Sequence, residues 1–82
     1  MCLTINKGDV LLKYGKWLRK KRIQNGYTQL ELSKLLYVSR HTVTKWENGK
    51  SRPSVELLEE IFRIFKCTDE EIASFFSSYN HT

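Results

Sequence analysis

Residues 28–49 have the sequence TQLELSKLLYVSRHTVTKWENG, and two signals for the start of a helix lie within them. Thr28 and Glu31 form a capping-box pattern, in which each side chain can satisfy a backbone amide at the start of a helix. Ser39 is a second cap residue, and Gly49 is typical of the position that follows a helix end. Two helices are therefore predicted, one from Thr28 through Leu36 and one over about Arg40–Asn48.

The connection between these two predicted helices is very short. Only Tyr37 and Val38 separate the end of the first helix from the cap of the second, which makes an antiparallel arrangement difficult. A turn this tight favours the steep crossing of a helix-turn-helix, and an antiparallel hairpin in an unrelated bundle is the alternative. The residues that fit a packed crossing are Leu32, Leu36, Val38, Val43 and Trp46, with the small Ser33 where the two helices approach closely.

The rest of the chain also carries helix signals, and no stretch alternates convincingly with the period of a strand. Three further helices are predicted. Asp9 is expected to cap one that runs to about Asn25, and Ser54 one that runs to about Lys66. Thr68 and Glu71 form a second capping-box pattern, which starts a helix from Thr68 onwards. The expected fold class is therefore all-α, with five helices in a single domain over residues 1–82. Its core is expected over about residues 10–73, and residues 74–82 form a C-terminal extension.

Charge is distributed unevenly along the 82 residues. The chain has 14 Lys and Arg against 9 Asp and Glu, a formal net charge of +5. Residues 1–52 carry 12 basic and 3 acidic side chains (+9), whereas residues 53–82 carry 2 and 6 (−4). A basic front and an acidic back favour a polyanionic partner on one side, and a chance asymmetry of a solvated surface is the alternative.

Signals for catalysis, metal binding and membrane insertion are missing from the sequence. A chain this short holds one modest core, which disfavours a deep enzyme cleft. Cys2 and Cys67 form no CxxC pair, and no apolar run approaches the ~20 residues that span a bilayer. No Ser/His/Asp set, phosphate-binding glycine loop or secretory signal is present. We therefore expect a cytoplasmic protein that is not an enzyme, with no cofactor, no metal and no membrane partner.

The second of the two central helices has a face that suits a nucleic acid. At about 100° per residue, Val43 and Trp46 point one way, whereas the opposite face is polar and cationic. A helix of this kind fits the major groove of B-DNA, where each base pair presents a distinct pattern of donors and acceptors. The polar face comprises His41, Thr44, Lys45 and Asn48, with Arg40 at its edge.

Three segments of the sequence resemble the phage repressor and Cro group, the XRE-type helix-turn-helix regulators. They are RIQNGYTQLELS over residues 22–33, VSR over 38–40 and WENGKSRPS over 46–54. The resemblance covers roughly residues 13–73 and implies a repressor-like domain that binds double-stranded operator DNA. Members of this family usually bind palindromic sites as dimers.

The function expected from this resemblance is that of a small repressor that binds a palindromic operator as a homodimer. An antitoxin or a restriction-modification controller protein of the same fold is an alternative, as is a protein-interaction module that has lost DNA binding. Because the remaining chain leaves no room for an effector domain, we expect switching to come from a regulatory protein partner, from oligomerisation or from concentration.

The resemblance also assigns roles to individual residues. The family's docking places the N-terminal part of the second helix against the bases, which implies base contacts from Ser39, Arg40, His41, Thr44 and Lys45. Phosphate contacts fix the register of the protein on DNA without recognising sequence. They are implied for Gln29, Thr42, Asn48, Lys50 and Arg52. Arg22 is expected to form a partly buried ion pair with Glu47, as the arginine and glutamate at these positions do in the family.

Two features depart from the family's pattern. Tyr37 occupies a turn position that is usually glycine, so either backbone strain or a different turn is expected there. The C-terminal extension is more apolar than one helix end needs. We expect Phe75, Phe76 and Tyr79 to form a dimer contact, and packing within the monomer is the alternative.

Overall fold

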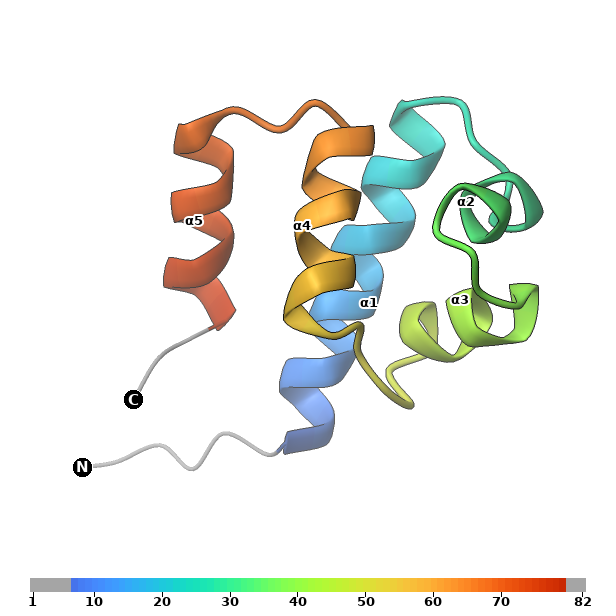
Figure 1. Cartoon of the computed structure of the whole chain (residues 1–82). Helices are drawn as coiled ribbons and strands as arrows, with labels where there is room; N and C mark the ends of the chain where they lie inside the picture. The colour runs from blue at the N-terminus through green and yellow to red at the C-terminus, as the bar shows by residue number, and fades with distance from the viewer. Residues whose placement is uncertain (1–6, 80–82) are drawn as a thin grey trace. The chain divides into compact units, whose positions relative to one another are not determined.

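The structure is a computed structural model that describes residues 7–79, and the side chains of residues 10–77. It contains five helices and, within the described residues, no strand, as the sequence predicts (Figure 1). The helices are α1 (Lys7–Gln24), α2 (Gln29–Leu35), α3 (Arg40–Glu47), α4 (Val55–Ile64) and α5 (Asp69–Tyr79). No helix within 7–79 is both long and apolar enough to cross a membrane.

The chain divides into two compact units, Met1–Arg52 and Pro53–Thr82. The first unit contains α1, α2 and α3, and the second contains α4 and α5. This boundary coincides with the change in charge along the sequence, so the first unit has a formal charge of +9 and the second of −4.

The predicted caps at the starts of α2 and α3 are confirmed. At α2, the Glu31 amide donates to Thr28 Oγ1 at 3.0 Å, and the Thr28 amide donates to Glu31 Oε1 at 2.8 Å, which completes the capping box. At α3, the Thr42 amide donates to Ser39 Oγ at 3.1 Å. These bonds satisfy amides that have no partner inside the helix, and so they fix where α2 and α3 begin.

The bounds of two other helices differ from the prediction. Asp9 is not the cap of α1, because that helix already begins at Lys7. An acidic residue is favoured inside a first turn as well as at a cap, and the sequence pattern does not distinguish the two positions. α4 ends at Ile64 rather than near Lys66, whose φ of 54° is left-handed and stops the helix.

The turn between α2 and α3 requires an unusual backbone at Tyr37. Its φ is 57°, in the left-handed region that costs a non-glycine residue about 1–2 kcal/mol. The side chain is 96% exposed, so burial of its ring does not offset this cost. The Val38 amide donates to the Ser33 carbonyl at 3.0 Å and closes the turn. In Figure 1, α2 is seen nearly end-on whereas α3 lies across the view, so the two helices cross steeply.

The core of the first unit takes apolar residues from all three of its helices. Leu18 of α1, Leu32 of α2 and Val43 of α3 are fully buried, and Leu36 and Trp46 are nearly so. Ser33 is also buried at the crossing of α2 and α3, where its hydroxyl donates to the Leu30 carbonyl at 2.7 Å. A buried hydroxyl needs such a partner, and here the helix's own backbone supplies it.

Gly15, in the middle of α1, allows a close approach that the sequence analysis missed. A Cβ added at this position would lie 2.5 Å from the Trp46 carbonyl oxygen and 2.6 Å from that of Glu47. The backbone of α1 therefore lies directly against the carboxyl end of α3. The sequence did contain a signal for this contact, because a glycine inside a helix lowers the stability of the helix and is usually there to allow close packing.

The second unit is an antiparallel pair of helices with an aromatic cluster (Figure 1). Phe62 of α4 contacts Phe75 and Phe76 of α5 edge to face, with ring centroids 5.4 and 6.0 Å apart. At the start of α5, Thr68 and Glu71 form the second predicted capping box. The aromatic contacts hold α5 beside α4, and the capping box fixes where α5 begins.

We expect Gly15→Ala to destabilise the protein although alanine is the better helix former. Helix propensity alone would favour the alanine by roughly 1 kcal/mol, whereas the new methyl group would lie within 3 Å of two backbone carbonyl oxygens, so the backbone must shift. Overpacking of this kind costs about 1–3 kcal/mol. Urea denaturation followed by circular dichroism measures the difference. Lys16→Ala, at the next and exposed position of α1, is the control and should change stability by less than about 0.5 kcal/mol.

Candidate nucleic-acid interface

An ion pair between Arg22 and Glu47 joins the end of α1 to the end of α3. Arg22 Nε donates to Glu47 Oε2 at 2.7 Å, and Arg22 Nη2 donates to Glu47 Oε1 at 3.1 Å, so the contact is bidentate. The two side chains are only 10% and 2% exposed. Arg22 Nη1 donates a third hydrogen bond, to the Tyr27 carbonyl at 2.8 Å. The same guanidinium therefore also binds the loop before α2.

Gln29 and Thr44 extend this network to the start of α2. Gln29 Nε2 donates to Glu47 Oε1 at 3.0 Å, and Thr44 Oγ1 donates to Gln29 Oε1 at 3.0 Å. One carboxylate thus accepts hydrogen bonds from α1 and α2 while it belongs to α3. Charge-assisted and bidentate bonds of this kind are the strong ones in proteins, so the orientation of α3 is fixed from two sides.

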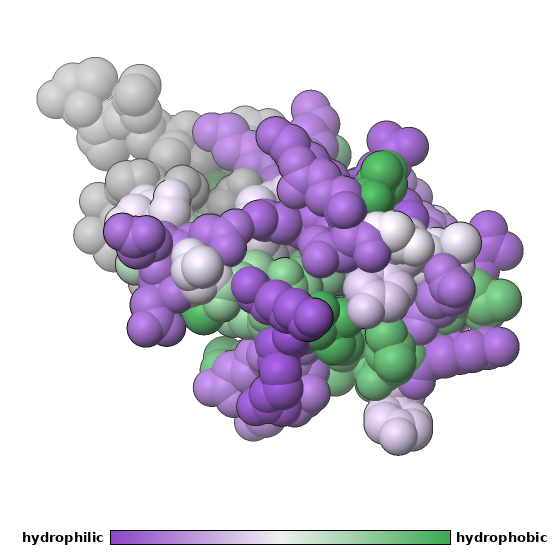
Figure 2. Space-filling model, turned by 90° about the horizontal axis from the view of Figure 1, so that it is seen from above, coloured by the Kyte–Doolittle hydropathy of each residue, from purple (hydrophilic) through white to green (hydrophobic). Residues whose placement is uncertain are grey.

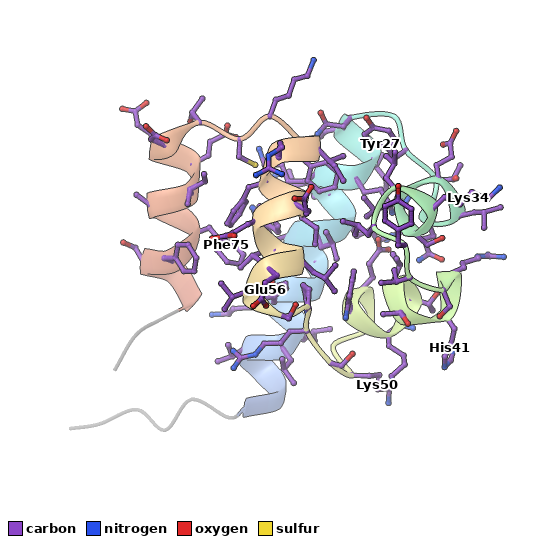
Figure 3. All side chains as sticks on the ribbon, viewed as in Figure 1. Tyr27, Lys34, His41, Lys50, Glu56 and Phe75 are labelled. Atoms are coloured by element: carbon purple, nitrogen blue, oxygen red, sulfur yellow. The ribbon has the colours of Figure 1, made fainter. Side chains whose placement is uncertain are left out.

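The outward face of α3 holds most of the residues that the sequence analysis assigned to bases. Arg40, His41 and Lys45 are exposed, as is the cap residue Ser39. Figure 3 shows the His41 side chain extending away from the other helices of the first unit. No hydrogen bond from the side chains of Arg40, His41 or Lys45 to another described residue is found, so their donors face solvent.

Three of the five residues assigned to phosphate follow the end of α3. Asn48, Lys50 and Arg52 are exposed. In Figure 3 the Lys50 side chain extends to the same side of the first unit as His41, whereas Lys34 on α2 points elsewhere. Figure 3 thus places one side chain of α3 and one of the following loop on the same side of the first unit.

Four assigned residues, Ser39 among them, have side-chain hydrogen-bond partners within the protein. Thr44 is half-buried, and its hydroxyl donates inward to Gln29. Both ends of the Gln29 amide are hydrogen-bonded within the unit. Thr42 is half-buried too, and its hydroxyl lies 2.9 Å from the Ser39 hydroxyl. The helical wheel placed Thr44 on the outward face, but the start of α2 covers part of it.

Arg52 also acts on a buried group of α1. Burial raises the pKa of the Tyr14 hydroxyl above its ordinary value, and the positive charge of Arg52 opposes that shift. Desolvation is the larger effect because a phenolate is costly in an apolar environment. Tyr14 is therefore neutral at physiological pH, and it contributes no negative charge beside the cations of the first unit.

The expected dimer residues of α5 lie in different environments. Phe75 is 4% exposed and packs on Phe62, so its ring belongs to the core of the second unit. Phe76 is 43% exposed and is a large apolar side chain open to solvent. The side chain of Tyr79 lies outside the described residues. Among the three, Phe76 is the one that the structure shows to be accessible.

The surface seen from above is mainly hydrophilic. Figure 2 shows polar residues over much of this face, with hydrophobic residues visible between them. Within residues 7–79, no group of three or more His, Cys, Asp and Glu side chains is arranged to hold a metal ion.

Comparison with known proteins identifies relatives among transcriptional regulators. Residues 18–72 match the helix-turn-helix family. The chain is 36% identical over 63 residues to the HTH-type transcriptional activator BcrR of Enterococcus faecalis. The aligned region covers 77% of this chain and 31% of BcrR. It is 41% identical over 46 residues to the uncharacterized HTH-type transcriptional regulator YqaF of Bacillus subtilis, covering 56% of this chain and 60% of YqaF.

The chain thus spans less than two thirds of the length of either relative. Among solved structures, the clp gene regulator ClgR of C. glutamicum is similar in fold, with a TM-score of 0.68. That match has 22% sequence identity and covers 96% of this chain and 97% of the ClgR chain.

We expect Glu47→Ala to be among the most destabilising substitutions in the first unit. It leaves the Arg22 guanidinium without a carboxylate in a site where Arg22 is 8% exposed. Loss of one partner of a buried ion pair costs about 3–5 kcal/mol. Urea denaturation at neutral pH measures the change, and Glu47→Gln, which retains a hydrogen-bond acceptor, should be affected less.

Glu60→Ala is the control for that measurement. It breaks the exposed pair between Glu60 and Arg63, whose side chains are 50% and 71% exposed. A pair this exposed contributes between about 0 and 1 kcal/mol. Equal losses of stability in Glu47→Ala and Glu60→Ala would contradict the structural role assigned to the buried pair.

Proposed function

Because this chain belongs to the XRE-type helix-turn-helix family of transcriptional regulators, we propose that it binds double-stranded DNA at a specific sequence and thereby regulates transcription. The proposal rests on α3, which is held firmly on its inner side and has an exposed polar and cationic outer face. Its inner face and carboxyl end are fixed by α1 and α2, while Arg40, His41 and Lys45 are exposed with unused donors. A rigid helix with an exposed cationic face is suited to the major groove.

Arg40 and Lys45 are the residues to which we assign the main base contacts. A guanidinium can donate two parallel hydrogen bonds to the O6 and N7 atoms of guanine, and an ammonium can donate to the same edge. His41, one position further into α3, can donate or accept according to its tautomer. Ser39 lies at the amino end of α3, where its hydroxyl already caps the helix. We assign it a contact shared with this capping role.

Contacts with phosphate would hold α3 in register. Lys50, Arg52 and Asn48 supply exposed donors beside the carboxyl end of α3. Gln29 retains one of its two amide hydrogens after donating to Glu47, and we assign that hydrogen to a phosphate oxygen. Thr42, whose hydroxyl is hydrogen-bonded to the hydroxyl of Ser39, is the remaining candidate. Such contacts position the protein without recognising sequence.

We further propose that the protein acts as a homodimer on a palindromic site and represses by occupying a promoter. Two copies of α3 would then contact half-sites one helical turn of DNA apart, about 34–36 Å. The proposed dimer contact is the exposed ring of Phe76 together with Tyr79, three residues further along the sequence of α5. Repression by occupancy needs only the DNA-contacting face of the first unit, whereas activation or control by a regulatory protein requires a second surface.

The DNA proposal is tested by selecting duplexes from a random pool and measuring affinities against salt. We expect one enriched motif. The logarithm of the binding constant should fall linearly with the logarithm of the salt concentration, with a slope of about −0.9 per phosphate contact. Arg40→Ala should lose about 1–3 kcal/mol of discrimination between bases at one position of the motif. Lys50→Ala should weaken binding to all DNA sequences to the same extent. Lys34→Ala, which removes the same charge from α2, is the control and should retain both motif and affinity. Absence of any motif together with a shallow salt slope would contradict the proposal.

The dimer proposal is tested by Phe76→Glu. A charge placed on an exposed apolar side chain should abolish a contact that buries it, so analytical ultracentrifugation should show a lighter species. Ser74→Glu adds the same charge at an exposed position on another face of α5 and should leave the assembly intact. If the wild-type protein sediments as a monomer, alone and on its selected DNA, the dimer is wrong while DNA binding stands.

A further inference from the structure

We infer that Thr44 faces DNA as a hydrogen-bond acceptor, and that it therefore selects a base carrying an amino group, adenine or cytosine. The inference rests on the proposed function, because it assumes that α3 enters the major groove. It goes further by fixing the direction of one hydrogen bond from contacts inside the protein. Those contacts run from Arg22 through Glu47 and Gln29 to Thr44.

First, the contact with Glu47 determines the orientation of the Gln29 amide. Glu47 is a carboxylate paired with a guanidinium, so its oxygens accept hydrogen bonds and donate none. The group of Gln29 that lies 3.0 Å from Glu47 Oε1 must therefore be the NH2 group. The carbonyl oxygen of the same amide then faces Thr44, and it can only accept.

The second step is the single proton of the Thr44 hydroxyl. Two protein atoms lie within hydrogen-bond distance of Thr44 Oγ1, namely Gln29 Oε1 at 3.0 Å and the Arg40 carbonyl oxygen at 3.1 Å. Both are acceptors, so the proton points into the protein in either case. The outward part of the hydroxyl is then a lone pair, beside the methyl group of the same side chain.

The consequence concerns which base edges Thr44 can contact. In the major groove, adenine N6 and cytosine N4 are amino donors, whereas guanine O6 and N7 and thymine O4 are acceptors. A lone pair contacts the first group favourably and the second unfavourably. Donation to a base would break the hydrogen bond that this proton makes inside the protein, to Gln29 Oε1 or to the Arg40 carbonyl, so turning the proton outward is disfavoured.

The test compares Thr44→Val and Thr44→Ser with the wild-type protein in selection from random duplexes. Thr44→Val keeps the shape and a methyl group but removes the hydroxyl, and Thr44→Ser keeps the hydroxyl. We expect the wild type and Thr44→Ser to enrich adenine or cytosine at one position, and Thr44→Val to lose that enrichment. The base preference due to Arg40 should be unchanged in all three.

A base analogue makes the test specific for the amino group. Replacing the selected adenine by purine, or the selected cytosine by 2-pyrimidinone, deletes the amino group. We expect this to weaken wild-type binding about two- to tenfold and to leave Thr44→Val unaffected, the range expected for one hydrogen bond.

Two results would overturn the inference and are distinguishable. A motif that depends on Arg40 but shows no loss of adenine or cytosine enrichment in Thr44→Val refutes the role of Thr44 alone. Failure of the wild-type protein to enrich any motif refutes the proposed function, and the role of Thr44 with it.

Discussion

The burial of Arg22 and Glu47 is the constraint on which the arrangement of the first unit depends. Two opposite charges removed from water are stable only if both keep their partners. Glu47 meets this requirement by accepting from Arg22 and Gln29, and Arg22 by donating also to the Tyr27 carbonyl. Each bond comes from a different part of the chain, so α3 cannot rotate or slide without stranding a charge. Gly15 adds a steric limit at the same end of α3.

Local patterns predicted the starts of helices better than their other features. The capping boxes at Thr28 and Thr68 and the cap at Ser39 are short-range hydrogen bonds that the sequence encodes directly. The prediction that Asp9 caps α1 was wrong, because an acidic residue is favourable in the first turn of a helix as well as at its cap. The end of α4 was placed too far along, because nothing in the composition around Lys66 marks its left-handed backbone.

The candidate site was predictable in its outward residues and less so in its inward partners. Helical periodicity alone places Arg40, His41 and Lys45 opposite the buried Val43 and Trp46, and the structure has them exposed. Periodicity describes one helix in isolation, however, and it could not show that the start of α2 covers Thr44. The bonds from Gln29 to Glu47 and Thr44 join residues 18 and 15 positions apart. Only the crossing of the two helices brings them together.

The attachment of α3 at its carboxyl end has a consequence for how such a protein evolves. Arg40 and His41 lie at the other end, where their side chains bond to no other described residue, so substitutions there leave the buried contacts intact. Changes at exposed positions away from such contacts usually alter stability by less than about 0.5 kcal/mol. In the proposed function, a duplicated gene could therefore acquire a new target through substitutions at Arg40 or His41 while the protein remains folded. Except at Ser39 and Thr44, which have both roles, the positions that stabilise α3 differ from those proposed to contact bases.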